Sequence, residues 1–250
     1  DGVLALFDAH IHYSQDAWAR TPPKEALAIL ARAGVRRALV SSTPDAGTLR
    51  LYELAPDVVV PILRPYRTRD DIGGWTRDGT IVAYLESAYR KGIHRGIGEF
   101  HLLAGEASTP VVRAVVALAV REDLLLHAHA DERAVEELLR VDPRAKVIWA
   151  HAGMSAAPQT VGALLDRHPR LVVELALRTD VAPGGALDPA WRAVFVRHAD
   201  RFMVGTDTWV PGRWDQVVDG HRHTRAWLSQ LPREVAERIA SGNAERLFGR

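Results

Sequence analysis

The sequence predicts an α/β protein, folded as a single (β/α)₈ TIM barrel that covers residues 1–250. Eight short apolar runs rich in Val, Leu and Ile alternate with eight longer segments of helical character, the pattern of βα units around a parallel sheet. A barrel of this kind typically needs about 250 residues, and the chain has 250. No Gly/Ser linker, low-complexity segment or change in composition divides it.

The apolar runs predict the strands in chain order. These strands cover Leu4–Asp8, Ala38–Ser41, Val58–Leu63, Arg95–Glu99, Leu124–His127, Lys146–Ala150, Leu171–Leu175 and Phe202–Gly205. The segments that follow each strand predict the helices. These helices cover Pro23–Ala33, Thr48–Leu54, Ile81–Arg90, Pro110–Arg121, Glu132–Leu139, Thr160–Arg167, Pro189–Arg197 and Trp214–Leu231. Eight alternations favour a closed barrel over an open doubly wound sheet.

Local signals support several of these boundaries. Pro22 and Pro23 stand where the first turn of a helix tolerates missing amide donors, and Gly34 follows the same helix, where a left-handed cap is favoured. Thr109 and Pro110 predict an N-cap followed by proline at the first helical position.

Composition restricts the class of protein. Hydrophobic residues make up 47% of the chain and charged residues 25%, which is typical of an ordinary soluble globular protein. The formal charge of +1 gives no reason to expect nucleic acid or an anionic membrane as a partner, and no apolar stretch is long enough to cross a bilayer. We expect a small-molecule substrate. The chain starts at Asp1, so we expect an upstream segment to have been removed. A periplasmic or a cytoplasmic location and a homodimer stay open.

The absence of cysteine removes disulfides, thiolate nucleophiles and Cys-ligated zinc, so any metal must be held by His and carboxylate. His10 and His12 follow the first apolar run. Residues i and i+2 of a strand point to the same side, about 6.6 Å apart, and both imidazoles can converge on one cation. The pair therefore indicates half of a metal site.

Functional groups of such barrels lie at the carboxyl ends of the strands, and five of the eight predicted strands end in candidate ligands. The candidates are His10 and His12 on the first strand, Glu99 on the fourth, His127 and His129 on the fifth, His151 on the sixth and Asp207 on the eighth. His and carboxylates are poor choices for the apolar wall of a barrel, so their recurrence here indicates a site.

The ordered set His10-x-His12, Glu99, His127, His151 and Asp207 resembles the amidohydrolase superfamily, specifically its amidohydrolase-2 branch, and the glutamate motif is similar to that of TatD-like hydrolases. The resemblance covers nearly the whole chain, from Phe7–His12 to Asn243–Phe248, which is similar to the family's C-terminal helix. Each motif alone is common, whereas the set is specific.

The resemblance implies roles for these residues. His10 and His12 would bind the more buried metal together with Asp207, Glu99 would bind or bridge, and His127 and His151 would complete a second, more exposed position. In relatives with one metal, His127 often joins the first position and His151 turns to the substrate or the water, so one ion and two ions both stay open. Many relatives with two metals carry a carboxylated lysine on strand four, where this chain has Glu99 and no lysine nearby.

The chemistry of the set also stands without the family. A divalent ion with imidazole and carboxylate ligands and an open position lowers the pKa of bound water to about 7 and polarises a carbonyl. Asp207 would take the proton of the water and pass it to the leaving group, and His151 is the second catalytic candidate. Nitrogen-rich ligation favours zinc, although manganese, cobalt, nickel or iron would suit the same ligands.

Other residues at the predicted mouth are candidates for substrate binding. They are Arg64, Arg67, His101, His129, Arg178 and Trp209. An Arg fork matches a carboxylate, which favours a small acidic or polar carbonyl substrate; the alternative is that these Arg residues form ion pairs at the rim. His129 could equally orient a ligand, and His101 could be an ordinary loop residue. We expect Glu174 to be paired in the barrel, with Arg178 as a partner, and Asp8 to cap or orient its neighbours.

The remaining histidines fall on predicted helices or their flanking turns, where we expect them to be solvated. They are His94, His168, His198, His221 and His223. His221 and His223 do not form a metal pair, because residues i and i+2 of a helix do not face each other.

The function that these observations favour is a metal-dependent hydrolase that uses metal-activated water on a C–O or C–N bond of a lactone, ester or amide. The alternatives are a metal-dependent nonoxidative decarboxylase of a small carboxylic acid and a noncatalytic metal-binding barrel. A nuclease is disfavoured because the chain has no basic stripe.

Overall fold

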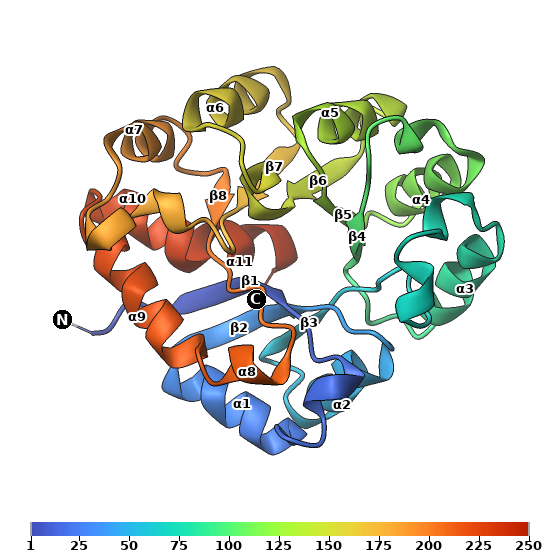
Figure 1. Cartoon of the computed structure of the whole chain (residues 1–250), viewed down its shortest axis with the longest axis horizontal. Coiled ribbons are helices and arrows are strands. Elements are labelled where there is room, and N and C mark those ends of the chain that lie inside the picture. The colour runs from blue at the N-terminus through green and yellow to red at the C-terminus, as the bar shows by residue number, and fades with distance from the viewer. Residues whose placement is uncertain (1, 250) are drawn as a thin grey trace.

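The computed structural model describes residues 2–249, which form a barrel of parallel strands surrounded by a ring of helices (Figure 1). The strands are β1 (Leu6–Ile11), β2 (Val35–Val40), β3 (Val59–Pro61), β4 (Gly96–His101), β5 (Leu125–His129), β6 (Lys146–Trp149), β7 (Leu171–Glu174) and β8 (Phe202–Met203). The TIM-barrel class expected from the sequence is confirmed, and each predicted strand overlaps an observed one.

The strands form two parallel ladders, β1 to β3 and β4 to β8, in chain order. Backbone hydrogen bonds join the two ladders at both seams. Between β3 and β4, Leu63 N–H donates to the Gly96 carbonyl at 3.0 Å; between β8 and β1, Ala9 N–H donates to the Val204 carbonyl at 2.9 Å. Asp207 N–H also donates to the His10 carbonyl at 2.8 Å. The second seam therefore brings the ends of the first and the last strand together.

The described residues also contain helices that follow the strands. They are α1 (Pro23–Arg32), α2 (Ala46–Leu54), α3 (Thr80–Tyr89), α4 (Pro110–Arg121), α5 (Glu132–Val141), α6 (Pro158–Arg167), α7 (Pro189–Arg197), α8 (Pro211–Trp214), α9 (Val217–Leu228), α10 (Arg233–Glu237) and α11 (Asn243–Phe248). In this part of the chain, no helix has the length and apolar character that a membrane span requires.

Local chemistry explains several helix ends. Thr109 accepts a hydrogen bond from Val112 N–H at 3.2 Å with Pro110 as the first helical residue, as predicted. Gly34 has a φ of +71°, which confirms the left-handed cap after α1. The predicted helix Trp214–Leu231 is wrong in extent, because the segment divides into α8 and α9.

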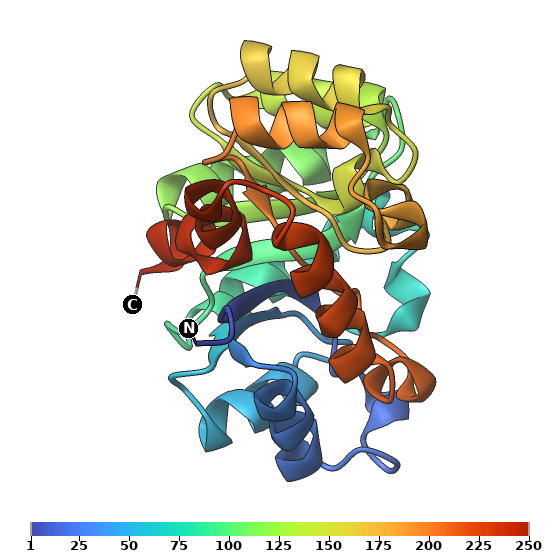
Figure 2. The same ribbon diagram turned by 90° about the vertical axis from the view of Figure 1, so that its left-hand side faces the viewer.

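Two apolar cores stabilise the barrel. The larger lies between the strands and the outer helices. The smaller core fills the barrel interior with inward residues from most strands, including Phe7, Leu125 and Met203. Ala244 and Phe248 of α11 pack against this core. Phe248 of α11 stacks on Phe7 of β1 with ring centroids 5.8 Å apart, and Figure 2 shows α11 beside β1. The apolar side chains fill this end of the barrel interior, and the buried imidazoles and carboxylates of His10, His12, Glu99 and Asp207 lie toward the carboxyl ends of the strands.

Gly98 permits the close contact of β4 with β5 and supplies a test of the barrel wall. A Cβ at Gly98 would lie 2.3 Å from the backbone oxygen of His127, and φ at Gly98 is +138°. Gly98→Ala should lower the free energy of unfolding by roughly 1–3 kcal/mol, because the backbone cannot move aside. Urea denaturation measures the effect. Gly79→Ala is the control, since nothing lies within 4 Å of that position; equal midpoints for the two variants would contradict the prediction.

Candidate metal centre

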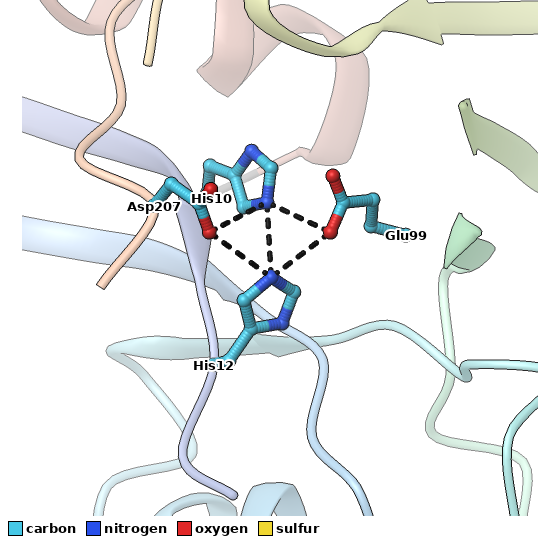
Figure 3. A group of neighbouring side chains, drawn as sticks. All are labelled: His10, His12, Glu99 and Asp207. Atoms are coloured by element: carbon cyan, nitrogen blue, oxygen red, sulfur yellow. Dashed lines mark hydrogen bonds and ion pairs between the residues drawn. The ribbon is translucent and has the colours of Figure 1, made fainter. Parts of the chain in front are cut away.

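Four side chains meet at the carboxyl ends of the barrel strands (Figure 3). His10 is in β1 and His12 follows it, Glu99 is in β4, and Asp207 follows β8. The Nε2 atoms of His10 and His12 lie 3.0 Å apart. Glu99 Oε1 lies 3.2 Å from His10 Nε2 and 3.1 Å from His12 Nε2, and Asp207 Oδ1 lies 3.3 Å from each. The structure thus brings together four of the predicted ligands.

These separations fit a small cation. Neighbouring ligand atoms at about 2.0–2.1 Å from zinc lie about 2.9–3.4 Å from one another in four- or five-coordinate sites, and the five separations given above run from 3.0 to 3.3 Å. Two imidazole nitrogens and two carboxylate oxygens suit a divalent transition ion. The described residues therefore fit the metal that the sequence predicts.

The other ring nitrogen of each histidine is engaged, which fixes the tautomer. His10 Nδ1 lies 2.9 Å from Glu174 Oε1, and His12 Nδ1 lies 2.5 Å from the Ser41 carbonyl. Because a carbonyl or carboxylate can only accept, Nδ1 of each ring carries a hydrogen. When a cation occupies the cluster, each ring would therefore bind it as a neutral ligand through Nε2.

His151 faces the same space from the end of β6. Its Nδ1 donates to the Ala176 carbonyl at 2.8 Å, while its buried Nε2 has no hydrogen-bond partner among residues 2–249. That Nε2 lies 3.4 Å from Glu99 Oε2 and 3.6 Å from Asp207 Oδ2. A buried nitrogen without a partner is costly, so this atom is available to a ligand in the cluster.

Backbone strain marks two of these residues. His151 has a φ of +59° and Asp207 a φ of +50°. Non-glycine residues rarely adopt such values, which cost about 1–3 kcal/mol and gather at functional sites. The surrounding barrel holds both side chains in place at this cost.

His127 lies deeper than the sequence suggests. It is buried, and its Nε2 is 3.5 Å from Glu174 Oε1 rather than at the cluster. His129, two residues on, faces Glu99 instead, with its Nδ1 3.3 Å from Glu99 Oε2, and His101 stacks on it with ring centroids 4.3 Å apart. Glu99, His101 and His129 form a further group with metal-ligand spacing. The expectation that His127 and His151 form a more exposed metal position is wrong, because both side chains are buried.

The charges of the cluster are strongly coupled. Burial alone would lower the pKa of His10, but Asp207, Glu99 and Glu174 raise that pKa well above its ordinary value. Burial would raise the pKa of Glu99 and of Glu174, yet the charge on His10 holds both well below their ordinary range. The pKa of Asp207 is lowered for the same reason. Three carboxylates around one imidazole favour a cation in their midst.

A second buried network holds the strand ends behind the cluster. Asp8 Oδ1 accepts hydrogen bonds from His10 N–H at 3.0 Å and Thr206 N–H at 3.1 Å, and Asp8 Oδ2 lies 2.8 Å from His221 Nε2. The expectation that Asp8 orients its neighbours is confirmed. The expectation of a solvated His221 is wrong, because α9 turns this side chain, 0% exposed, onto β1.

Two more histidines are corrected in the same way. His94 is buried against Asp45 at 3.0 Å, and His198 is buried against Asp166 at 3.2 Å. His223 is exposed, as expected. Position on or near a helix did not reveal which face packs inward.

The predicted substrate-binding residues separate into two groups. Arg64, His101, His129 and Trp209 line a cavity of about 530 Å³ that opens onto His12, Glu99 and Asp207. Arg67 instead pairs with Asp71 and Asp78, and Arg178 pairs with Asp180 and donates to backbone carbonyls. Neither lines that cavity. The alternative of ion pairing therefore describes these two arginines.

Glu174 is a site residue whose importance the sequence did not reveal. The expected pairing of Glu174 with Arg178 is wrong. Glu174 instead accepts hydrogen bonds from His10 Nδ1 at 2.9 Å and from the backbone N–H of His151 at 2.8 Å. A charged residue inside the apolar run Leu171–Leu175 was the available signal, because a buried carboxylate requires partners. Arg69, Ile72 and Leu177 also line the cavity and had no comparable signal.

A (β/α)₈ barrel with imidazoles and carboxylates gathered at the carboxyl ends of its strands is the arrangement of a metal-dependent barrel enzyme. The family model described as amidohydrolase matches residues 81–250. The chain belongs to this amidohydrolase family, as its sequence motifs indicated, and is a metal-dependent enzyme of that superfamily. The matched residues include Glu99, His127, His151 and Asp207.

Solved structures share the fold. A TatD homologue from Escherichia coli is 18% identical with a TM-score of 0.65, and the match covers all of both chains. A candidate 2-pyrone-4,6-dicarboxylic acid hydrolase from Pseudomonas putida is 15% identical with a TM-score of 0.62, covering 98% of each chain. N-isopropylammelide isopropylaminohydrolase from Burkholderia multivorans is 18% identical with a TM-score of 0.59, covering 98% of this chain and 74% of the other. No curated protein matches the chain.

Proposed function

We propose that this protein hydrolyses a C–O or C–N bond of a small lactone, ester or amide, with the chain of 250 residues acting as one barrel domain. The observation that carries the proposal is the cluster of His10, His12, Glu99 and Asp207. Its two Nε2 atoms lie 3.0 Å apart, and one oxygen of each carboxylate lies 3.1–3.3 Å from both of them. A cavity of about 530 Å³ opens onto them, a size suited to a small ligand.

His10, His12, Glu99 Oε1 and Asp207 Oδ1 would hold a divalent ion, for which we propose zinc. Glu99, His101 and His129, which also have metal-ligand spacing, would hold a second ion. An ion bound there would act as a Lewis acid and lower the pKa of a bound water.

The protein's own residues supply the proton transfer. Asp207 directs Oδ1 to the two histidines, while Oδ2 faces His151 Nε2 at 3.6 Å. Oδ2 is therefore the oxygen that accepts a proton from the attacking water and returns it to the leaving group. His151 Nε2 is positioned to accept a hydrogen bond from the water, because its Nδ1 carries the ring hydrogen and donates to the Ala176 carbonyl.

Metal analysis followed by a substrate panel tests the proposal. We expect about one or two zinc ions per chain and turnover of at least one lactone, ester or amide, with oxygen from solvent water in the product. Loss of activity on chelation and its return with zinc would support the assignment. Release of carbon dioxide without incorporation of solvent oxygen would instead identify a decarboxylase. Tight metal binding without a solvent-exchangeable ligand would favour a noncatalytic barrel, because structural sites are saturated by protein ligands.

A further inference from the structure

We infer that the cavity above the metal cluster selects a small substrate with a carboxylate group and an apolar body, and that Arg64 binds the carboxylate. This inference rests on the proposed function, because it assumes that the same cavity admits the substrate. The cavity is lined by His12, Glu99 and Asp207 of the cluster and by Arg64, whose terminal nitrogen lies 3.4 Å from Glu99 Oε1. A group bound by Arg64 would thus lie beside the reacting centre.

Arg64 is held in place, but its terminal guanidinium nitrogens form only long hydrogen bonds. The residue is 8% exposed, its Nε donates to the Glu99 carbonyl at 2.9 Å, and its guanidinium lies 4.6 Å above the Tyr66 ring. Its terminal nitrogens, by contrast, lie 3.3 Å from Thr43 Oγ1 and 3.4 Å from Glu99 Oε1. These contacts are longer than the usual 2.7–3.2 Å. A carboxylate would give the same nitrogens shorter, charge-assisted hydrogen bonds.

The charges of the cavity favour an anion. Glu99 and Asp207 are its lining carboxylates, and a divalent ion held between them would balance both. Arg64 is the lining arginine that reaches the cluster, 3.4 Å from Glu99 Oε1, since the second lining arginine, Arg69, pairs with Asp16 at 2.7 Å. With Glu99 engaged by the ion, a carboxylate on the substrate would give Arg64 a partner of opposite charge in a partly desolvated space.

Part of the cavity lining is apolar. Ile72, Leu177 and Trp209 line it, and the last two remain 36% and 44% exposed. Large apolar side chains exposed at a cavity mouth are typical of a surface that contacts a ligand. An aromatic or branched aliphatic body would cover them while its carboxylate reaches Arg64.

The affinities of two isosteric probes test the inference. Zinc-loaded protein is titrated by calorimetry with phenylacetate and with uncharged phenylacetamide. Phenylacetate should bind the wild type at least about tenfold more tightly than phenylacetamide. Arg64→Met should weaken phenylacetate binding by about 10- to 100-fold and change phenylacetamide binding by less than about twofold. Equal affinity for the two probes, no phenylacetate binding, or an unchanged Arg64→Met variant would overturn the inference.

Two further measurements separate Arg64 from the metal. After zinc removal, Arg64→Met should still weaken phenylacetate binding. A preference for phenylacetate that disappears with the zinc and is unchanged by Arg64→Met would overturn the inference. Arg64→Lys keeps the positive charge but lacks the planar guanidinium. It serves as the second variant if Arg64→Met does not fold, and it should bind phenylacetate about tenfold more weakly than the wild type. Arg50→Met is the control, because Arg50 also lies over an aromatic ring, 3.7 Å from that of Trp18, but does not line the cavity. Arg64-dependent binding without hydrolysis of any panel compound would contradict the reaction and leave the binding site standing.

Discussion

Replacing Asp207 with asparagine should lower kcat by about 10²- to 10⁴-fold, the usual contribution of a general acid–base group. Asparagine keeps the shape of the side chain and a carbonyl oxygen, but it cannot accept a proton at neutral pH. Asp207 Oδ1 faces His10 and His12, and its second oxygen lies 3.6 Å from His151 Nε2, where it can exchange a proton with the water. Steady-state kinetics on whichever compound the panel identifies measures the loss.

Zinc content must be measured on the same samples, because Asp207 Oδ1 also belongs to the cluster. A variant that retains its zinc and loses activity supports a role in proton transfer. A variant that retains both zinc and activity contradicts it. Asp188→Asn is the matched control: Asp188 accepts a hydrogen bond from Trp191 N–H at the start of α7, a role that asparagine can also fill. Its kcat should stay within about twofold of the wild type.

The architecture and the order of the ligands could be predicted because they depend on local patterns. Short apolar runs separated by helical segments define a barrel, and in a barrel the residue after each strand faces the same end. That reasoning needs only the position of His10, Glu99, His151 or Asp207 along its own strand. It requires no knowledge of what the side chain meets across the barrel.

Depth within the barrel could not be predicted in this way. His127 and His129 lie on the same face of β5, because side chains two residues apart point to the same side. They differ by about 6.6 Å along the strand, and this single step decides which one reaches Glu99 and which one meets Glu174. The sequence motif was compatible with either.

Partners distant in the sequence were equally hidden. His221 contacts Asp8 from 213 residues away, and the pairing depends on which face of α9 packs against β1. Arg178 was expected to pair with Glu174, four residues earlier, but it binds Asp180, two residues later. Glu174 was thereby left to bind His10, 164 residues away. Tertiary packing, and not the separation of charges along the chain, selected these pairs.

Glu174→Gln should weaken zinc binding by about 10- to 100-fold, as expected when a carboxylate that orients a ligating imidazole is lost. Glu174 Oε1 accepts from His10 Nδ1 at 2.9 Å and from the backbone N–H of His151 at 2.8 Å, and Oε2 accepts from Ala176 N–H at 2.9 Å. Glutamine has one acceptor and one donor group at these places. Whichever way its amide is turned, an NH₂ group meets an N–H donor and at least one hydrogen bond is lost.

The orientation of that amide decides what happens to His10. With the amide oxygen toward His10, the ring keeps its tautomer and only the bond to Ala176 is lost. With the NH₂ group toward His10, the ring must move its hydrogen to Nε2, the atom that lies 3.2 Å from Glu99 and 3.3 Å from Asp207. Competition with a chromophoric chelator measures zinc affinity, and ¹⁵N NMR of the imidazoles reports the tautomer. Asp45→Asn is the control, since Asp45 forms a buried pair with His94 outside the cluster. Zinc affinity equal to wild type in Glu174→Gln would contradict the prediction.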